Sequence, residues 1–393
     1  MKFTVFTPVY NRAYCINNLY QSLKGQTYKN FEWIVIDDGS TDNVGEIIKK
    51  WIDDENDFPI IYARVKNGGK MRAVNKGVRL STAPAFFIVD SDDTLTENAM
   101  ELLNTWFQVI ENNKRFAGVS GLKQISTVPV KYDFEYVDAT NLERRIYNLS
   151  PDMAECYKTE ILRQHLAPEI DGENYISPSI VWNQIAKEGY KLRWYNKYIY
   201  KAEYQEDGLS RQGYVNLRKK NPIGWGKLIS LNIECKGDVD YKEFQWYWYY
   251  QNLRDELSID KIADYLNIRK IDLQELIDKK PRIVRYINKY FHEHEIKSVG
   301  LYGLGSNAKK FLSLRDVWDV EIRYGIDRLP NSLVEPCYCP SDRLPNADCI
   351  LITNMFGSEE IKTELKRSHN EIKCISLEND ILEKSMSYYF SEI

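Results

Sequence analysis

The chain has 393 residues, a length at which a single hydrophobic core usually gives way to two or three domains. Hydrophobic residues make up 43% and charged residues 28% of the sequence, which are the proportions of a soluble globular protein. The net charge of −4 argues against general binding to nucleic acid, and no apolar run is long enough to cross a bilayer.

The seven cysteines and four histidines show no spacing typical of a metal site. Cys337 and Cys339 lack the two-residue gap common in zinc and redox motifs. His292 and His294 have the wrong spacing for two ligands on one helical face. We therefore expect a reducing, cytoplasmic location, with residues 1–6 forming a first strand rather than a signal peptide.

The first ninety residues alternate apolar strands with helical segments. The pattern predicts strands at 3–7, 31–37, 60–65 and 85–89, and helices at 17–23, 44–51 and 71–79. Such alternation is typical of a parallel sheet covered by helices on both faces. Ligands of these sheets bind beyond the carboxyl ends of the strands.

Polar residues follow each of these four strands. They are Thr7-Pro8, Asp37-Asp38-Gly39-Ser40, Asn67-Gly68-Gly69-Lys70 and Asp90-Ser91-Asp92-Asp93. Because the carboxyl ends of parallel strands meet at one edge of a sheet, we expect the four clusters to surround one crevice. Helix capping alone is a poor explanation for four consecutive strand ends of this kind.

The cluster at 90–93 directly follows the apolar run Phe87–Val89. Carboxylates placed together repel one another unless a cation lies among them, and Mg²⁺ or Mn²⁺ holding a diphosphate is the usual cation. The alternative is an acidic turn that caps a helix starting near 94–97. The other three strand ends favour the interpretation as a metal and diphosphate site.

The pattern weakens beyond Ser120, where we expect a helix near 180–188 and a strand near 191–200. Residues 217–289 are helical in pattern and contain the aromatic run 244–250. We interpret this run as helix-packing core, because aromatic side chains dominate buried interfaces. Sugar stacking and a membrane-surface patch are the alternatives; the basic trio Arg218-Lys219-Lys220 would suit a membrane surface.

A second strand–helix unit begins near residue 297. The segment 303–308, Gly-Leu-Gly-Ser-Asn-Ala, follows an expected strand at 298–302 and leads into an expected helix at 309–314, and Asp327 ends the next strand. This is a degenerate dinucleotide fingerprint in the right context, so we predict a small Rossmann-like domain. NAD binding is one interpretation, and a structural, oligomerising or partner-binding role is another. Further strands are expected at 349–353 and 372–377.

Four segments in this order resemble family-2 glycosyltransferases of the GT-A fold. They are TPVYNR (7–12), QTYKNFEWIVIDDGSTDN (26–43), NGGKMRAVNKG (67–77) and FFIVDSDD (86–93). A looser match, to bacterial capsule and surface-glycan enzymes of this family, continues through residues 168–186 and 204–210. The specific resemblance covers about the first hundred residues.

The resemblance implies a nucleotide-sugar donor, most often a UDP-sugar, and a divalent cation, Mn²⁺ or Mg²⁺. The implied nucleotide-sugar-binding residues are Thr7, Pro8, Tyr10, Asp38, Lys70, Arg72, Asp90, Ser91 and Asp92. Thr7 would line the base pocket, and Asp38 would accept a hydrogen bond from the uracil N3–H. Lys70 and Arg72 stand where the family places cations that contact the base or ribose.

Asp90-Ser91-Asp92 matches the family's Asp-X-Asp element. The resemblance implies that Asp92 or Asp93 ligates the metal and that Asp90 faces the ribose or the metal shell. The metal would bridge the diphosphate oxygens and offset charge as the bond between sugar and phosphate breaks.

An inverting transferase also needs a base that takes the proton of the attacking acceptor hydroxyl. The family commonly supplies it from a Glu-Asp pair ahead of a Trp-bearing helix. The corresponding residues are Asp171-Gly172-Glu173-Asn174, with Trp182 following. Glu173 is the first candidate and Asp171 the second, and a plain polar loop is the alternative. Asn174 stands where the second acid is often found.

We expect a GT-A domain at 1–212, a helical region at 213–290 and a Rossmann-like domain at 291–393. The expected function is inverting, metal-dependent transfer from a UDP-sugar to a glycan, glycosylated protein or lipid in bacterial surface-glycan synthesis. The alternatives are an NAD-dependent sugar-modifying enzyme and a non-catalytic nucleotide-sugar-binding module. Asp207 is a further candidate for closing over donor or acceptor. Peripheral membrane association and a homo-oligomer are further expectations.

Overall fold

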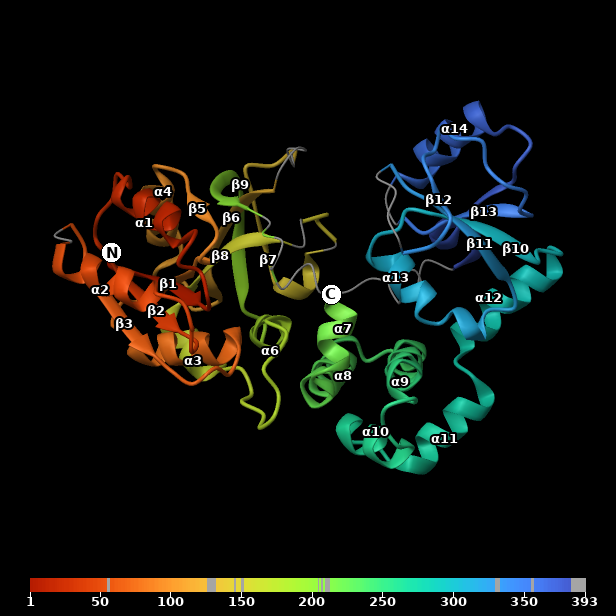
Figure 1. Ribbon diagram of the computed structural model, residues 1–393, viewed down its shortest axis with the longest axis horizontal. Coiled ribbons are helices and arrows are strands. Elements are labelled where there is room, and N and C mark those ends of the chain that lie inside the picture. The colour runs from red at the N-terminus through yellow and green to blue at the C-terminus, as the bar shows by residue number, and fades with distance from the viewer. Residues whose placement is uncertain are drawn as a thin grey trace. The chain divides into compact units, whose positions relative to one another are not determined.

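The structure is a computed structural model (Figure 1). It describes residues 1–54, 57–125, 132–144, 146–149, 152–203, 205, 208, 213–328, 333–354 and 357–382. The chain divides into two compact units, Met1–Leu231 and Asn232–Ile393. The α/β fold class predicted from the sequence is confirmed, because each unit has its own sheet with helices around it.

The first unit is built on a nine-stranded sheet with the order β3-β2-β1-β4-β8-β6-β9-β5, and β7 pairs with β9. The strands are β1 (Phe3–Val9), β2 (Phe31–Asp37), β3 (Ile60–Arg64), β4 (Ala85–Ile88), β5 (Thr94–Leu95), β6 (Phe116–Ile125), β7 (Tyr136–Ala139), β8 (Met153–Lys158) and β9 (Lys191–Ala202). Strands β1 to β4 are parallel to one another. The second half of the sheet is mixed, since β8 is antiparallel to β4 and β6, while β6 and β9 are parallel.

Helices cover both faces of this sheet. They are α1 (Ile16–Lys24), α2 (Val44–Asp54), α3 (Lys70–Leu80), α4 (Ala99–Ile110), α5 (Thr159–Gln164), α6 (Ser179–Lys187) and α7 (Tyr214–Lys219), and α8 (Pro222–Lys236) begins in this unit. Successive side chains of a strand point to opposite faces. Phe3 and Val5 of β1 therefore lie in one buried cluster, with residues of α1, α2 and α4. Phe6 lies in the other cluster, with residues of α3, α5 and α6.

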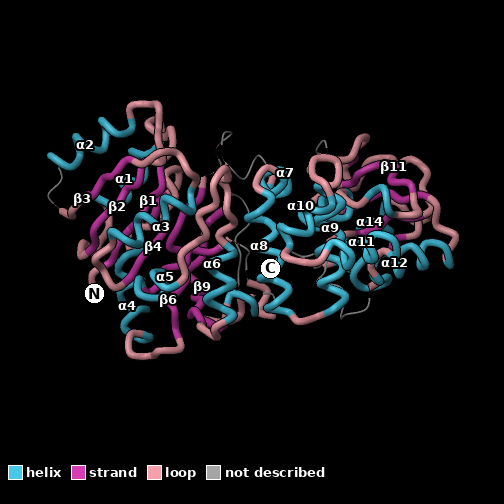
Figure 2. The backbone as a smooth tube through the Cα atoms, turned by 90° about the horizontal axis from the view of Figure 1, so that it is seen from below, coloured by secondary structure: helices cyan, strands magenta, loops and turns pink. Residues whose placement is uncertain are grey.

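The second unit contains a run of helices followed by a five-stranded parallel sheet. The helices are α9 (Val239–Leu253), α10 (Ile259–Leu266), α11 (Lys270–Lys279) and α12 (Arg282–Glu293), which follow one another without an intervening strand (Figure 2). The later elements are β10 (Ser298–Tyr302), α13 (Ser306–Leu312), β11 (Glu321–Ile326), β12 (Cys337–Tyr338), β13 (Cys349–Ile352), α14 (Ser358–Ser368) and β14 (Cys374–Ser376). The sheet order is β12-β11-β10-β13-β14. It equals the order of the first five strands in dinucleotide-binding sheets.

The aromatic run of α9 is packing core, as the sequence predicted. Phe244, Tyr247, Trp248 and Tyr249 are buried, and the indole of Trp248 donates a hydrogen bond to Ser313. These rings therefore stabilise the helical segment and are not exposed for sugar stacking.

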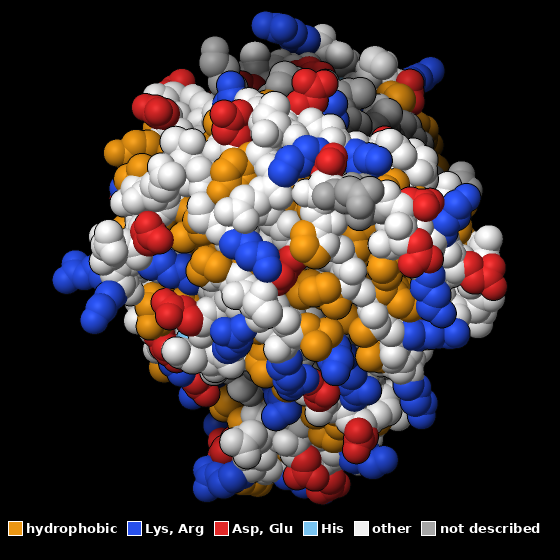
Figure 3. Space-filling model, turned by 90° about the vertical axis from the view of Figure 1, so that its left-hand side faces the viewer, with side chains coloured by type: hydrophobic (Ala, Val, Ile, Leu, Met, Phe, Trp, Pro, Cys, Tyr) orange, Lys and Arg blue, Asp and Glu red, His pale blue; other side chains and the backbone are white. Residues whose placement is uncertain are grey.

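No helix among the described residues is long and apolar enough to cross a membrane. Within the basic trio at 218–220, Arg218 is buried, Lys219 is half-buried and Lys220 is exposed. Acidic and basic side chains are interspersed on the face of the molecule in Figure 3. Neither observation marks out a basic surface.

Candidate active site

Hydrogen bonds, most of them made by Asn11, join two loops at the carboxyl edge of the first sheet. Asn11, which follows β1 with a φ of 52°, accepts a hydrogen bond from the Thr41 N–H at 2.7 Å and donates its own N–H to the Ser40 hydroxyl at 2.9 Å. The Ala13 N–H adds a bond to Asp42 at 2.8 Å. Asparagine tolerates this left-handed conformation better than most residues. The ends of β1 and β2 are thus one connected structure.

The Asp38 carboxylate holds the glycine turn after β3. Its two oxygens accept the N–H groups of Gly68 and Gly69, each at 2.8 Å, and the Asn67 amide lies at 3.3 Å. Burial raises the pKa of Asp38, and the two backbone bonds oppose that rise. Asp38 therefore lies at the edge where we expect the nucleotide, but its present partners belong to the protein. Its contact with uracil stays a prediction.

Gly69 allows a second loop to approach this turn. Its φ is +91°, and a Cβ added there would meet the carbonyl oxygen of Asn174 at 1.7 Å. The Arg72 guanidinium, one turn later on α3, donates to the Ile170 carbonyl. The loop that carries Asp171 and Glu173 consequently lies against the glycine turn and the start of α3.

The three residues predicted at the end of β1 differ in exposure. Thr7 is fully buried, and its hydroxyl accepts a hydrogen bond from the Trp33 indole at 3.0 Å. Pro8 is half-buried, whereas the Tyr10 side chain is 47% exposed. Of the three, Tyr10 is the side chain most open to a ligand.

An ion pair connects α3 with the acidic cluster. The ammonium of Lys70 donates to Asp90 at 2.6 Å, and about a third of each side chain is exposed. The predicted neighbourhood of Lys70 and Asp90 is therefore present in the structure. This contact joins the start of α3 to the turn that follows β4.

The segment 90–93 forms a tight turn that is held by β9. The Asp93 carboxylate accepts the Tyr200 hydroxyl at 2.7 Å and the Glu203 N–H at 2.8 Å. The Asp90 N–H donates to the same Tyr200 hydroxyl at 2.9 Å. Ser91 is buried and Asp92 is half-buried. Tyr200 was not among the predicted residues, because it comes from a strand 110 residues away in the sequence.

Burial and like charge shift the pKa values of this cluster. Burial, with a contribution from the charge of Asp90, raises the pKa of Asp93 to about 7 and also raises that of Asp92. Burial acts in the same direction on Asp90, but the ammonium groups of Lys70 and Lys123 outweigh it and lower its pKa. A divalent cation would relieve the repulsion at Asp92, so the donor set fits such an ion.

Within the described ranges, no group of three or more His, Cys, Asp or Glu side chains is arranged to hold a metal ion. Mg²⁺ and similar cations bound with nucleotides commonly use one or two carboxylates and complete their shell with phosphate oxygens and water. A cation at this turn would therefore depend on the diphosphate of a bound donor.

The two candidate bases have different environments. Glu173 is only 6% exposed, and its two oxygens accept the N–H groups of Ile223 at 2.6 Å and Gly224 at 2.8 Å. Burial raises its pKa, and these bonds at the N-terminus of α8 oppose the rise. Asp171 is exposed on the same loop. Asp207 lies outside the described residues.

The glycine turn of the second unit also lies at the carboxyl edge of its sheet. Gly303 has a φ of +82°, and a Cβ there would meet the Asn354 side-chain oxygen at 1.6 Å. Asp327 accepts the Leu304 N–H at 2.8 Å. The predicted acidic residue at the end of β11 therefore braces the turn in this structure.

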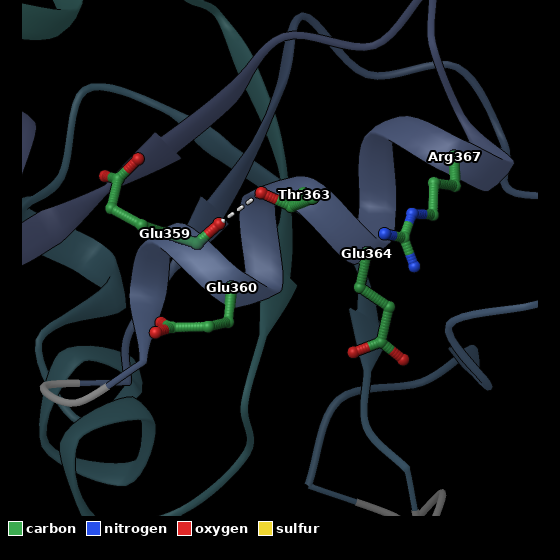
Figure 4. A pocket seen from close by; sticks show the side chains of 5 residues that line it. All are labelled: Glu359, Glu360, Thr363, Glu364 and Arg367. Carbon is green, nitrogen blue, oxygen red and sulfur yellow. Dashed lines mark hydrogen bonds between the residues drawn. The ribbon is translucent and has the colours of Figure 1, made fainter.

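A shallow hollow of the second unit is lined by α14 alone. Its lining side chains are Glu359, Glu360, Thr363, Glu364 and Arg367 (Figure 4). The Thr363 hydroxyl donates to the Glu359 carbonyl, and Glu364 pairs with Arg328 at 2.8 Å. These are ordinary contacts of a solvated helix, and none of the predicted site residues lies there.

Comparison with known proteins places one family match in the first unit. Residues 4–114 match the family described as Glycosyl transferase family 2. The chain is 37% identical over 100 residues to glycosyltransferase GlyG of Streptococcus pneumoniae, covering 25% of this chain and 33% of GlyG. It is 26% identical over 168 residues to the poly(ribitol-phosphate) beta-N-acetylglucosaminyltransferase TarS of Staphylococcus aureus, covering 42% of this chain and 29% of TarS. The chain thus spans a third or less of the length of these two relatives.

A solved structure of S. aureus TarS 1-349 in complex with UDP-GlcNAc is similar with a TM-score of 0.49 and 18% identity. The similarity covers 81% of this chain and 90% of that chain.

Proposed function

Because residues 4–114 match the family described as Glycosyl transferase family 2, we propose that the protein transfers a sugar from a UDP-sugar to an acceptor hydroxyl. The acceptor is a glycan, or a glycosylated protein or lipid, of a bacterial surface polysaccharide or glycoconjugate. The observation that carries the proposal is the gathering of three groups at the ends of parallel strands. These groups are the Asp38-bound glycine turn, the Lys70 ammonium and the acidic turn 90–93.

The donor's uracil is assigned to Asp38 and its diphosphate to the neighbourhood of Lys70. An ionised carboxylate has about four acceptor positions, and Asp38 uses three of them on residues 67–69. One acceptor position therefore remains for the uracil N3–H. Lys70 has three donors and gives one to Asp90, so it can also donate to a phosphate oxygen.

The cation, Mn²⁺ or Mg²⁺, is assigned to Asp92 with Asp90 beside it. An ion held by these carboxylates would offset the charge of the departing UDP. Lys70 and Lys123 keep Asp90 ionised. The chain thus keeps the negative charge of Asp90 beside the diphosphate site before a donor binds.

The transfer is proposed to invert the anomeric centre, with a carboxylate as the base. The sequence favours Glu173 over Asp171. The contacts favour Asp171, because both oxygens of Glu173 bind backbone N–H groups of α8 while Asp171 is exposed next to the glycine turn. A base needs to reach the acceptor hydroxyl within hydrogen-bond distance.

A donor screen that detects released UDP tests this function. The screen compares UDP-glucose, UDP-galactose and their N-acetyl forms, with Mn²⁺ and with EDTA, in the presence of a glycan mixture; UDP-GlcNAc is included also because of the similarity to TarS. We expect release of UDP from one donor, with Mn²⁺ present and EDTA absent. Tight UDP binding with no release from any donor would instead support a non-catalytic binding module. No stabilisation by UDP with Mn²⁺ would contradict the proposal.

A second candidate function is nucleotide binding by the C-terminal sheet. The strand order β12-β11-β10-β13-β14 and the turn at Gly303 favour it. NADH added alone to the full chain tests it, because a ligand that binds the folded state raises the melting temperature. Unchanged melting with NADH would leave a structural or oligomerising role for this sheet. Peripheral membrane association and a homo-oligomer stay predictions.

A further inference from the structure

Tyr200 is fully buried in β9 and makes contacts with both ends of the acidic turn. Its hydroxyl accepts the Asp90 N–H at 2.9 Å and donates to the Asp93 carboxylate at 2.7 Å. Its backbone position pairs with Leu95 of β5, directly after the turn. A single phenol therefore fixes where the turn begins and where it ends.

Both oxygens of Asp93 already accept hydrogen bonds from the protein. One oxygen accepts the Tyr200 hydroxyl and the other accepts the Glu203 N–H at 2.8 Å, and the residue is 6% exposed. To ligate a cation in the crevice, this nearly buried carboxylate would have to turn outward and give up bonds that hold the turn. Breaking such a bond leaves a buried polar group unsatisfied, which is costly.

Asp90 is influenced by two lysine ammonium groups. Lys70 binds it at 2.6 Å, and Lys123 of β6 lies close enough to help lower its pKa. The Lys123 ammonium pairs with Asp152 at 2.9 Å and lies 4.6 Å from the centre of the Tyr200 ring. The ring thus lies between the acidic turn and the partly exposed Lys123 ammonium, and these contacts constrain its position.

We propose that Tyr200 is a positioning residue of the donor site, which holds the turn so that Asp92 meets the diphosphate-bound cation while Asp93 braces the turn. The inference rests on the proposed function, since it assigns the cation to that site. It assigns different roles to Asp92 and Asp93, which the sequence pattern leaves as equivalent candidates for the metal ligand. It also gives the β9 strand, outside residues 4–114, a part in donor binding.

The first test needs no metal and no donor. In Tyr200→Phe the Asp90 amide loses its acceptor, so we expect hydrogen exchange of the peptide spanning 88–95 to become several-fold faster. Tyr157→Phe is the matched control, because among the described residues the buried Tyr157 hydroxyl has no hydrogen-bond partner. Tyr157 lies in β8 of the same sheet, beside β4. Equal exchange at 88–95 in the two variants would overturn the positioning role.

The second test measures the Mn²⁺ affinity of the UDP complex by calorimetry. We expect Tyr200→Phe to weaken it about tenfold, a typical effect of losing a group that orients metal ligands, while UDP binding in EDTA stays the same. Asp92→Asn should abolish the Mn²⁺ dependence, and Asp93→Asn should weaken it only as Tyr200→Phe does. A larger loss in Asp93→Asn than in Asp92→Asn would show that Asp93 is the ligand and overturn the inference.

Measurements on the wild-type protein distinguish failure of the positioning role of Tyr200 from failure of the proposed metal-dependent function. UDP binding that is independent of Mn²⁺ in the wild type would overturn both the inference and the metal-dependent function. Mn²⁺-dependent binding in the wild type with an unchanged Tyr200→Phe variant would overturn the inference alone.

Discussion

At the residue scale, Glu32 is a buried charged residue whose contacts stabilise the fold and lie outside the candidate active site. It is 2% exposed in β2 and binds the Lys2 ammonium at 2.5 Å, the Thr4 hydroxyl at 2.7 Å and the Thr82 N–H at 3.0 Å. Burial alone would raise its pKa, but these bonds outweigh burial and lower the pKa below its ordinary value of 4.5. A group with a lowered folded pKa stabilises the protein above its unfolded pKa.

Glu32→Gln is therefore expected to cost about 2 kcal/mol of unfolding free energy at pH 7, since hydrogen bonds to a charged group are lost. In the wild type this contribution disappears as the pH falls from about 4.5 through the lower folded pKa. Urea unfolding between pH 3 and 7 should give a flatter pH dependence for the variant. Parallel curves for the two proteins would contradict the prediction.

Asp171 and Glu173 can be separated by comparing stability with turnover. We expect Asp171→Asn to lower kcat about 100-fold or more with an unchanged melting temperature, because an exposed base is lost. We expect Glu173→Gln to lower the melting temperature, because an anionic acceptor at the N-terminus of α8 is lost, at a cost of about 1 kcal/mol. A loss of kcat in Glu173→Gln and a loss of stability in Asp171→Asn would instead identify Glu173 as the base.

Individual site residues could be predicted from the sequence only where they follow the strands of the parallel α/β pattern, whose carboxyl ends share one edge of the sheet. Lys70 and Asp90 follow neighbouring parts of a parallel α/β pattern, so their approach could be predicted and is found at 2.6 Å. Tyr200 and Asn11 could not be predicted. Tyr200 reaches the turn through antiparallel pairing of β5 with β9, and a strand register across such distances leaves no local signal.

At the element scale, the strands and helices of the first ninety residues could be predicted because each apolar strand is followed by an amphipathic helix. The observed β1 to β4 and α1 to α3 match the predicted ranges to within a few residues. Beyond Ser120 the sheet becomes mixed, and β6, β7 and β8 had no predicted counterpart. The helix expected at 309–314 begins earlier, at Ser306, because the glycine turn ends at Gly305.

The glycine turn before α3 offers a test of how closely two loops must approach. Gly69 and Gly172 both have positive φ, +91° and +82°, but only Gly69 faces a backbone, the Asn174 carbonyl. Gly172→Ala should cost about 1 kcal/mol from backbone strain. Gly69→Ala should cost about 2 kcal/mol more and weaken UDP binding, because the Asp38-bound turn must move.

Urea unfolding of the two alanine variants, with UDP binding measured beside it, checks this difference. The Gly172 variant serves as the control for the left-handed conformation itself. Equal losses in both variants would mean that the contact between the loops contributes little.

At the scale of the whole molecule, the chain divides into two compact units. The boundary falls near Leu231 within α8, and the helices α9 to α12 belong with the second sheet. The division predicted at 212 and 290 rested on the pattern of strands and helices and stays a prediction. A helical run between two α/β segments can pack with either one, and the choice depends on tertiary contacts that the pattern does not contain.

Hydrogen exchange of the full chain with UDP and Mn²⁺ tests which unit binds the donor. A ligand that binds only the folded state lowers local opening at its site, so we expect slower exchange near Asp38, at 67–72 and at 88–95. Peptides of residues 232–393 should be unaffected, which makes the second unit an internal control. Asp38→Asn should remove much of the protection, because the uracil acceptor and the anchor of the glycine turn are both weakened. Protection around 303–308 instead would assign the nucleotide to the C-terminal sheet and contradict the proposed donor site.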